Sequence, residues 1–307
     1  MGIHGLIFFA AFLTLSGIAT SPVLADFDGE PARWIQNPAL SPDGTLIAFT
    51  HRGQVFLTDH DGGLSIPVSP GDAYSHSVVW APDSKRLAFA SDVNGDDDVY
   101  LADFSGKLRR MTYSSAKEIP TSFSPDGKSV LYTAVRLGDP KRSIQAALSW
   151  QPQLYAVDTK SGRERLLLPN AAREARWNKD QTKLVYSYDP SADPVERQHR
   201  VAANARQLWL YDPANGKYNR LFEADGVDRL DPHWSIDGES LFYLSEASGW
   251  LNVWKLDLKS GQEVQLTHFE GAPVRNLSVA DDGTTAFGFK GQVFMLAAGS
   301  DKPQVVH

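Results

Sequence analysis

The chain has 307 residues, of which 42% are hydrophobic and 22% are charged. This composition excludes a largely disordered or collagen-like chain. The formal charge of −7 argues against nucleic acid as a partner, because a basic surface supplies most of the affinity for phosphate backbones. No cysteine is present, which excludes disulfides, thiolate metal sites and a cysteine nucleophile.

Residues 1–25 have the pattern of a secretory signal peptide. They contain no Lys, Arg, Asp or Glu, and an apolar run, Leu6–Leu15, is followed by small residues ending at Ala25. Such a run is short for a bilayer span, and small residues before a polar stretch are typical of a cleavage site. Only the terminal amine and His4 supply positive charge before the run. We therefore expect an exported protein, periplasmic or extracellular. The alternative is an uncleaved signal, which would be the only contact with the membrane.

A turn-forming tetrapeptide recurs six times after this segment. Ser41–Gly44 and Ser124–Gly127 read Ser-Pro-Asp-Gly, and looser copies occupy 81–84, 178–181, 235–238 and 280–283. Serine can bond back to the backbone, proline presets φ, aspartate suits the third place and glycine relieves the fourth. The third-place aspartates lie 40 to 57 residues apart, at Asp43, Asp83, Asp126, Asp180, Asp237 and Asp282.

The residues around each tetrapeptide predict strands. An apolar residue lies three places before each turn aspartate, and apolar residues four and six places after it follow the period of a strand. A second pattern then follows, apolar-aromatic-x-x-Asp, as in Val99–Asp103 and Leu208–Asp212, although the sixth copy ends at Ala297. Four strands per unit and six units predict an all-β chain, a six-bladed β-propeller with four antiparallel strands per blade.

The order of the units predicts how the ring closes. They run from first to fourth strand without permutation, so we expect no strand exchange at closure and side-chain packing between blades one and six. We place the propeller at residues 26–307 as one domain. The expected blades span approximately 34–72, 73–115, 116–170, 171–226, 227–271 and 272–307.

At these residues the sequence resembles the PD40 repeats of TolB-like proteins and of tricorn-type serine peptidases, family S41. The resemblance covers roughly residues 35–297. Segments outside the turns are similar to the tricorn-like family in particular: Asp231–Gly238 (DPHWSIDG), Phe242–Glu246 (FYLSE), Asn252–Trp254 (NVW), Leu266–Phe269 (LTHF), Pro273–Ser278 (PVRNLS) and Gly291–Phe294 (GQVF).

The resemblance implies a non-catalytic domain. In tricorn-type peptidases a six-bladed propeller precedes a second propeller or linker, a PDZ-like domain and a catalytic core. It would imply a substrate guide or scaffold that binds peptides or proteins, for a protease domain on a longer product or a partner chain. No position here matches the family's catalytic motifs, so no catalytic residue is carried over and enzymatic activity of this chain stays open.

Two other functions remain as alternatives. A free-standing TolB-like periplasmic propeller would contact other envelope proteins. TolB-like proteins carry an extra N-terminal α/β domain, however, and the roughly ten residues between Ala25 and the first expected strand are too few for one. An enzyme complete in itself would need convergent polar groups in the central channel, whereas the repeats supply aspartate mostly at turns.

We predict no cofactor and no metal site. The sequence has no His-Glu-x-x-His pair, no Gly-x-Ser-x-Gly elbow and no phosphate-binding glycine loop. In Asp92–Asp98 the oxygen-bearing residues alternate as they do in calcium loops. Asp97 stands where such a loop needs glycine, and Asp103 where it needs a bidentate glutamate. A polar hairpin and a calcium loop both remain open for this segment.

Two long segments join the second and third expected strands of blades three and four. Equivalent loops of adjacent blades emerge on one face, so we expect these two to meet. Long loops on a rigid scaffold commonly carry recognition, and the alternative is a solvated lid without function. The candidate contacts to a substrate or partner are the basic residues Arg136, Lys141, Arg142, Arg197, His199, Arg200 and Arg206.

Overall fold

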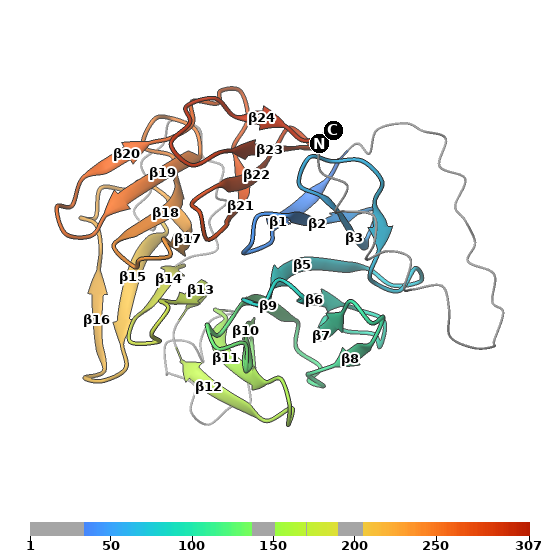
Figure 1. Cartoon of the computed structure of the whole chain (residues 1–307). Coiled ribbons are helices and arrows are strands. Elements are labelled where there is room, and N and C mark those ends of the chain that lie inside the picture. Colours follow the sequence, from blue (N-terminus) through green and yellow to red (C-terminus); the bar gives the residue numbers. More distant parts are fainter. Residues whose placement is uncertain (1–33, 137–150, 170, 190–204) are drawn as a thin grey trace, which may run out of the picture.

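The structure, a computed structural model, describes residues 34–136, 151–169, 171–189 and 205–307. Six sheets stand around a common axis (Figure 1), and each sheet contains four strands in chain order. Neighbouring strands of every sheet pair antiparallel, as in β2 with β3 and β22 with β23. The prediction of an all-β, six-bladed propeller is therefore confirmed. Within the described ranges, no helix is long and apolar enough to cross a membrane.

The strands have the following bounds. Blade one contains β1 (Gln36–Leu40), β2 (Leu46–His51), β3 (Gln54–Asp59) and β4 (Ile66–Pro67). Blade two contains β5 (Ser75–Trp80), β6 (Arg86–Ser91), β7 (Asp98–Asp103) and β8 (Leu108–Arg110). Blade three contains β9 (Glu118–Phe123), β10 (Ser129–Ala134), β11 (Gln153–Asp158) and β12 (Glu164–Leu168). Blade four contains β13 (Ala172–Trp177), β14 (Leu184–Tyr188), β15 (Gln207–Asp212) and β16 (Lys217–Arg220). Blade five contains β17 (Arg229–Trp234), β18 (Ser240–Ser245), β19 (Asn252–Asp257) and β20 (Glu263–Gln265). Blade six contains β21 (Arg275–Val279), β22 (Thr285–Phe289), β23 (Gln292–Leu296) and β24 (Gln304–Val305).

The predicted tetrapeptides form the turns between the first and second strand of each blade. In blade one, Ser41 Oγ donates to Asp43 Oδ1 at 2.6 Å, and Thr45 N donates to the same oxygen at 3.1 Å. Gly44 has φ +73°, a left-handed conformation that glycine adopts without steric cost. Burial alone would raise the pKa of Asp43, but the bonds from Ser41 and Thr45 lower it overall. The turns therefore have the local chemistry that the sequence predicts.

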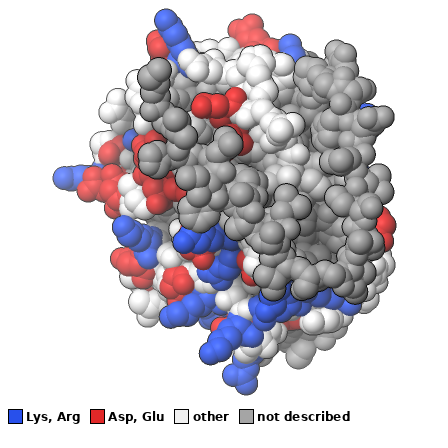
Figure 2. Space-filling view, turned by 45° about the vertical axis from the view of Figure 1, so that its right-hand side comes forward, with Lys and Arg blue, Asp and Glu red and all other residues white. Residues whose placement is uncertain are grey.

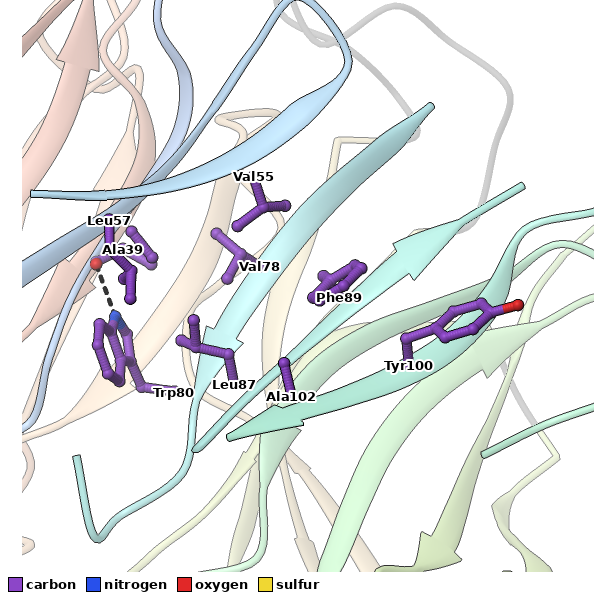
Figure 3. Close-up of a cluster of buried hydrophobic side chains, with 10 residues drawn as sticks. Ala39, Val55, Leu57, Val78, Trp80, Leu87, Phe89, Tyr100 and Ala102 are labelled. Atoms are coloured by element: carbon purple, nitrogen blue, oxygen red, sulfur yellow. Dashed lines mark hydrogen bonds between the residues drawn. The ribbon is translucent and has the colours of Figure 1, made fainter. Parts of the chain in front are cut away.

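The core lies between neighbouring blades. Figure 3 shows one such layer, in which Val55 and Leu57 of blade one face Val78 and Leu87 of blade two. At its edge, Trp80 Nε1 donates to the backbone carbonyl of Ala39 at 2.8 Å. Comparable buried clusters join blades two and three, three and four, four and five, and five and six. Each sheet therefore buries both of its faces against its neighbours.

Blades six and one close the ring without sharing a strand. Phe49 and Ile47 of blade one pack with Ala286 and Val293 of blade six. The backbone N–H of Leu40 donates to Ser278 Oγ at 2.8 Å across this seam. Closure by side-chain packing, without strand exchange, is thus confirmed.

Candidate functional site

The first strand of every blade lies next to the axis and is bulged. In five blades the residue six places before the turn aspartate has a left-handed backbone, with φ between 49° and 54°. The pairing register of the first strand shifts at or next to this place in all six blades, as expected where a left-handed residue interrupts a ladder. The residues at this place are Asn37, Ser77, Pro120, Glu174, Asp231 and Asn276.

These bulges line an axial cavity of about 460 Å³, to which the first strands of all six blades contribute. Blades one, two, three and six line it with neutral residues such as Pro38, Ser77, Pro120 and Asn276, apart from Asp281 in a turn. Blades four and five provide the other charged or ionisable lining residues: Arg173, Glu174, Arg176, Asp231 and His233. The cavity therefore has one ionisable wall and one neutral wall.

A hydrogen-bond network fixes the ionisable wall. Glu174 Oε2 accepts from Ser187 Oγ at 2.6 Å and from the backbone N–H of Asp231 at 2.7 Å. Arg176 Nη1 lies 3.1 Å from Asp231 Oδ1. The other carboxylate oxygen of Asp231 accepts from the backbone N–H of Leu277 at 2.8 Å. The network therefore joins blades four, five and six.

The two carboxyl groups of this wall differ in their affinity for protons. Burial, and next the negative charge of Asp231, raise the pKa of Glu174. Burial would raise the pKa of Asp231 as well, but the positive charge of Arg176 lowers it overall. Burial and the charge of Arg176 lower the pKa of His233, which favours a neutral imidazole. Glu174 is thus the carboxyl that first takes up a proton as the pH falls, while Asp231 stays ionised.

A second ion-pair group lies beside this wall. Arg173 Nε donates to Asp189 Oδ2 at 2.8 Å, and Arg206 Nη2 lies 3.3 Å from the same oxygen. The Asp189 side chain is buried. Arg206 also acts electrostatically on Glu174, so the group and the wall are electrostatically linked.

Two of the predicted contact residues fall within the described ranges. Arg136 pairs with Glu118, lies 2.6 Å from Glu164 Oε2, and stacks over the Tyr155 ring at 4.6 Å. Arg206 pairs with Asp189, as described above. Both side chains are thus engaged by carboxylates of their own blades. The other five, Lys141, Arg142, Arg197, His199 and Arg200, lie outside the described residues, as does the expected meeting of the two loops.

The acidic segment Asp92–Asp98 forms part of a hairpin in which three of the four aspartates contact other residues of the protein. Asp92 Oδ1 accepts from the backbone N–H of Tyr74 at 2.7 Å, and Asp98 Oδ2 lies 2.7 Å from Arg110 Nη2. Asp97 Oδ1 lies 3.3 Å from His76 Nε2. No three His, Asp or Glu side chains of the described chain are grouped so as to hold a metal ion.

Sequence reasoning missed the ionisable wall. The signal was present: six places before each turn aspartate, where an inner strand would place an apolar residue, the sequence has proline or a polar residue. Asp231 and His233 also belong to the segment that carries the family resemblance. Their position next to the axis became visible only once the ring was closed.

Comparisons with known proteins agree with this architecture. The model of the tricorn protease N-terminal β-propeller domain matches residues 32–302. A TolB homolog of Chlorobium chlorochromatii is 31% identical over 123 residues, which are 36% of this chain and 28% of that protein. Tricorn protease homolog 1 of Streptomyces coelicolor is 24% identical over 254 residues, 72% of this chain and 23% of that protein.

The crystal structure of the tricorn protease has the same fold. It superposes with a TM-score of 0.71 at 16% identity, over 90% of this chain and 26% of that chain. The matched region thus spans about a quarter of each of these three relatives. On the family match over residues 32–302, this chain belongs to the family of tricorn protease N-terminal β-propeller domains.

Proposed function

We propose that this propeller is a non-catalytic domain that docks or guides peptides for a protease part, located on a longer product or on a partner chain. Membership of the tricorn N-terminal propeller family supports the association with a protease. The chain covers 23% of tricorn protease homolog 1 and 26% of the tricorn protease structure, which agrees with a role as one part of a larger assembly.

The axial cavity is the observation that carries this proposal. Its volume of about 460 Å³ lies in the range of ligand-binding cavities. The wall with Arg173, Arg176 and Asp231 offers charges to peptide termini and side chains, while the opposite wall offers proline and small polar residues. The network across blades four to six holds these charges in place before a ligand arrives, which reduces the cost of ordering them on binding.

A free-standing TolB-like propeller that binds envelope proteins is the second candidate. The identity to the TolB homolog of Chlorobium chlorochromatii supports it. For either function we propose export to the periplasm or cell exterior, on the strength of the uncharged, apolar segment at residues 1–25.

Narrowing the axial cavity tests the proposal. Ile119 lines the cavity, so Ile119→Trp should lower the affinity for short peptides at least tenfold, measured by fluorescence anisotropy with a labelled peptide library. Ile236 is 48% exposed in the turn of blade five, outside the cavity lining, and Ile236→Trp is the matched control. It should leave the affinity within twofold of the unmodified chain.

The outcomes separate the candidate functions. If Ile119→Trp and Ile236→Trp bound the peptides with equal affinity, the peptide site would lie away from the axis. Binding of folded envelope proteins but not of short peptides, unaffected by Ile119→Trp, would favour the TolB-like function. Peptide hydrolysis by the isolated chain would contradict a non-catalytic role.

A further inference from the structure

Basic residues concentrate on the outer hairpins of blades two and three. The β7–β8 segment 103–110 has three Lys and Arg against one Asp, and the β11–β12 segment 158–165 has three against two acids. The corresponding segment of blade one, 59–67, has two Asp and neither Lys nor Arg. Figure 2 shows Lys and Arg side chains gathered over the lower part of the molecule, where Figure 1 places blades two and three. This concentration stands out on a chain of formal charge −7.

The carboxylates of these two segments are already engaged. Asp103 Oδ1 accepts from the backbone N–H of Ser105 at 2.9 Å, and Asp158 Oδ1 accepts from Ser161 N and Oγ, both at 2.7 Å. Glu164 Oε2 accepts from Tyr132 and pairs with Arg136. Most of the cations, in contrast, have no ion pair with any residue the structure describes: Lys107, Arg109, Lys160, Arg163 and Arg165.

Two of these five cations, Arg163 and Arg165, line a hollow. A groove of about 450 Å³ lies between blades three and four, with Arg163 and Arg165 on the blade-three side and Trp177 and Gln181 on the blade-four side. Lys128 also lines it, 3.4 Å from its turn partner Asp126. Arg109 Nη1 of blade two donates to the carbonyl of Lys160 at 3.3 Å, so the basic surface continues from the groove onto the neighbouring blade.

We propose that this basic groove, defined by Lys128, Arg163, Arg165 and Trp177, binds an acidic segment of a protein. A guanidinium group presents two parallel N–H donors that match a carboxylate, and neither the Arg163 nor the Arg165 guanidinium forms an ion pair within the described ranges. The Trp177 side chain supplies an apolar surface for the stem of a Glu side chain. The site is separate in its chemistry from the axial cavity, although Trp177 borders both.

The shape of the groove favours an acidic protein segment over an anionic membrane. The cations line a concave surface, which a planar bilayer does not enter. Asp126 and Asp158 lie in the same groove, and the turn bonds from Ser124 and Ser161 hold the pKa of each below its usual value. A uniformly negative surface would be repelled by the negative charges of Asp126 and Asp158. A segment with spaced carboxylates, in contrast, can pair with the two arginines and keep its own charges away from these aspartates.

Removal of the two arginine charges tests the site. With the full 307-residue chain and a fluorescein-labelled peptide of alternating Glu and Gly, Arg163→Gln/Arg165→Gln should weaken binding at least tenfold. The matched control, Lys259→Gln/Lys302→Gln, removes the same charge from exposed positions on blades five and six. It should change the affinity by less than twofold. A Gln-Gly peptide should not bind, and the Glu-Gly affinity should fall as salt rises.

Three results would overturn the proposal. The unmodified chain could fail to bind the Glu-Gly peptide, both double variants could weaken binding equally, or anionic phospholipid vesicles could bind without competition from the peptide. Ile119→Trp should leave Glu-Gly binding unchanged, so failure of the axial site and failure of the basic groove are distinguishable.

Discussion

At the scale of single residues, the charges next to a buried carboxyl decide whether its pKa rises or falls. Glu174 and Asp231 lie in the same wall, yet their pKa values shift in opposite directions. Asp231 has the charge of Arg176 and the Leu277 N–H to stabilise its ionised form. Glu174 accepts hydrogen bonds from two neutral donors, Ser187 Oγ and the Asp231 N–H, and the negative charge of Asp231 outweighs the positive charge of Arg206. Of the two carboxyl groups, Glu174 is therefore the one whose protonation changes the charge of the wall first as the pH falls.

This difference predicts a pH-dependent stability. Because the pKa of Glu174 is raised in the folded state, its contribution to stability is present at low pH and is lost as the pH rises through that pKa. Glu174→Gln keeps an acceptor for Ser187 and for the Asp231 N–H but cannot ionise. We expect the stability of the variant relative to the unmodified chain to increase as the pH rises above about 4.3, the ordinary pKa of a glutamate side chain, measured by urea unfolding.

Glu239 provides the control, because its side chain is exposed in the turn of blade five. The stability difference between Glu239→Gln and the unmodified chain should stay constant over the same pH range. An equally constant difference for Glu174→Gln would mean that Glu174 does not titrate differently in the folded and unfolded states.

At the scale of strands and blades, the tryptophan three places before the turn aspartate joins neighbouring sheets. Trp80 Nε1 donates to the Ala39 carbonyl at 2.8 Å, and Trp234 Nε1 donates to the Arg176 carbonyl at 3.0 Å. In each case the acceptor belongs to the first strand of the preceding blade. Each of these tryptophans thus packs in the layer between two blades. Its hydrogen bond fixes the position of its own first strand along the first strand of the preceding blade.

Trp80→Phe should remove this bond while keeping most of the packing. The Ala39 carbonyl would keep its place in the β1–β2 ladder opposite Ala48 and lose only the indole donor, so the free energy of unfolding should fall by about 0.5–1.5 kcal/mol, the net contribution of one hydrogen bond. Trp177 occupies the equivalent place in blade four and makes no such bond to a described residue, so Trp177→Phe is the matched control. An equal loss in both variants would assign the effect to ring size instead of the hydrogen bond.

Much of the blade structure could be predicted from sequence because its determinants are local. Ser41, Asp43 and Gly44 form a turn by bonds within five residues, and Ile47 and Phe49 follow the period of the next strand. The pairing of Arg136 with Glu118 and Glu164 could not be predicted, because it requires the packing of three strands. The bulges at Glu174 and Asp231 interrupt the apolar alternation, so their place beside the axis depends on ring closure and not on local pattern.

At the scale of the whole molecule, the seam between blades six and one is packed like the interfaces inside the ring. Phe49 at the seam is 3% exposed, and Phe89, at the equivalent place in blade two, is 0% exposed. Each lies six places after its turn aspartate and packs into a layer between two blades. The comparison predicts that the ring unfolds as one unit.

Phe49→Ala should therefore destabilise the chain about as much as Phe89→Ala. Each should cost about 3–5 kcal/mol, the usual range for removing a buried phenylalanine side chain, and each should unfold in a single calorimetric transition. A much smaller loss for Phe49→Ala, or a separate early transition, would show that the seam opens independently. Leu64→Ala, at a side chain that is 92% exposed, should leave the free energy of unfolding almost unchanged.

The seam also determines how the molecule would respond to mechanical load. In the described chain, blades six and one are joined by side chains and isolated hydrogen bonds such as that from Leu40 N to Ser278 Oγ. Tension applied between residues 34 and 307 would separate blades six and one before it disrupted the strand pairing within any four-stranded sheet. The ring would then open at the seam, and further extension would detach whole blades one after another, starting with blade one or blade six.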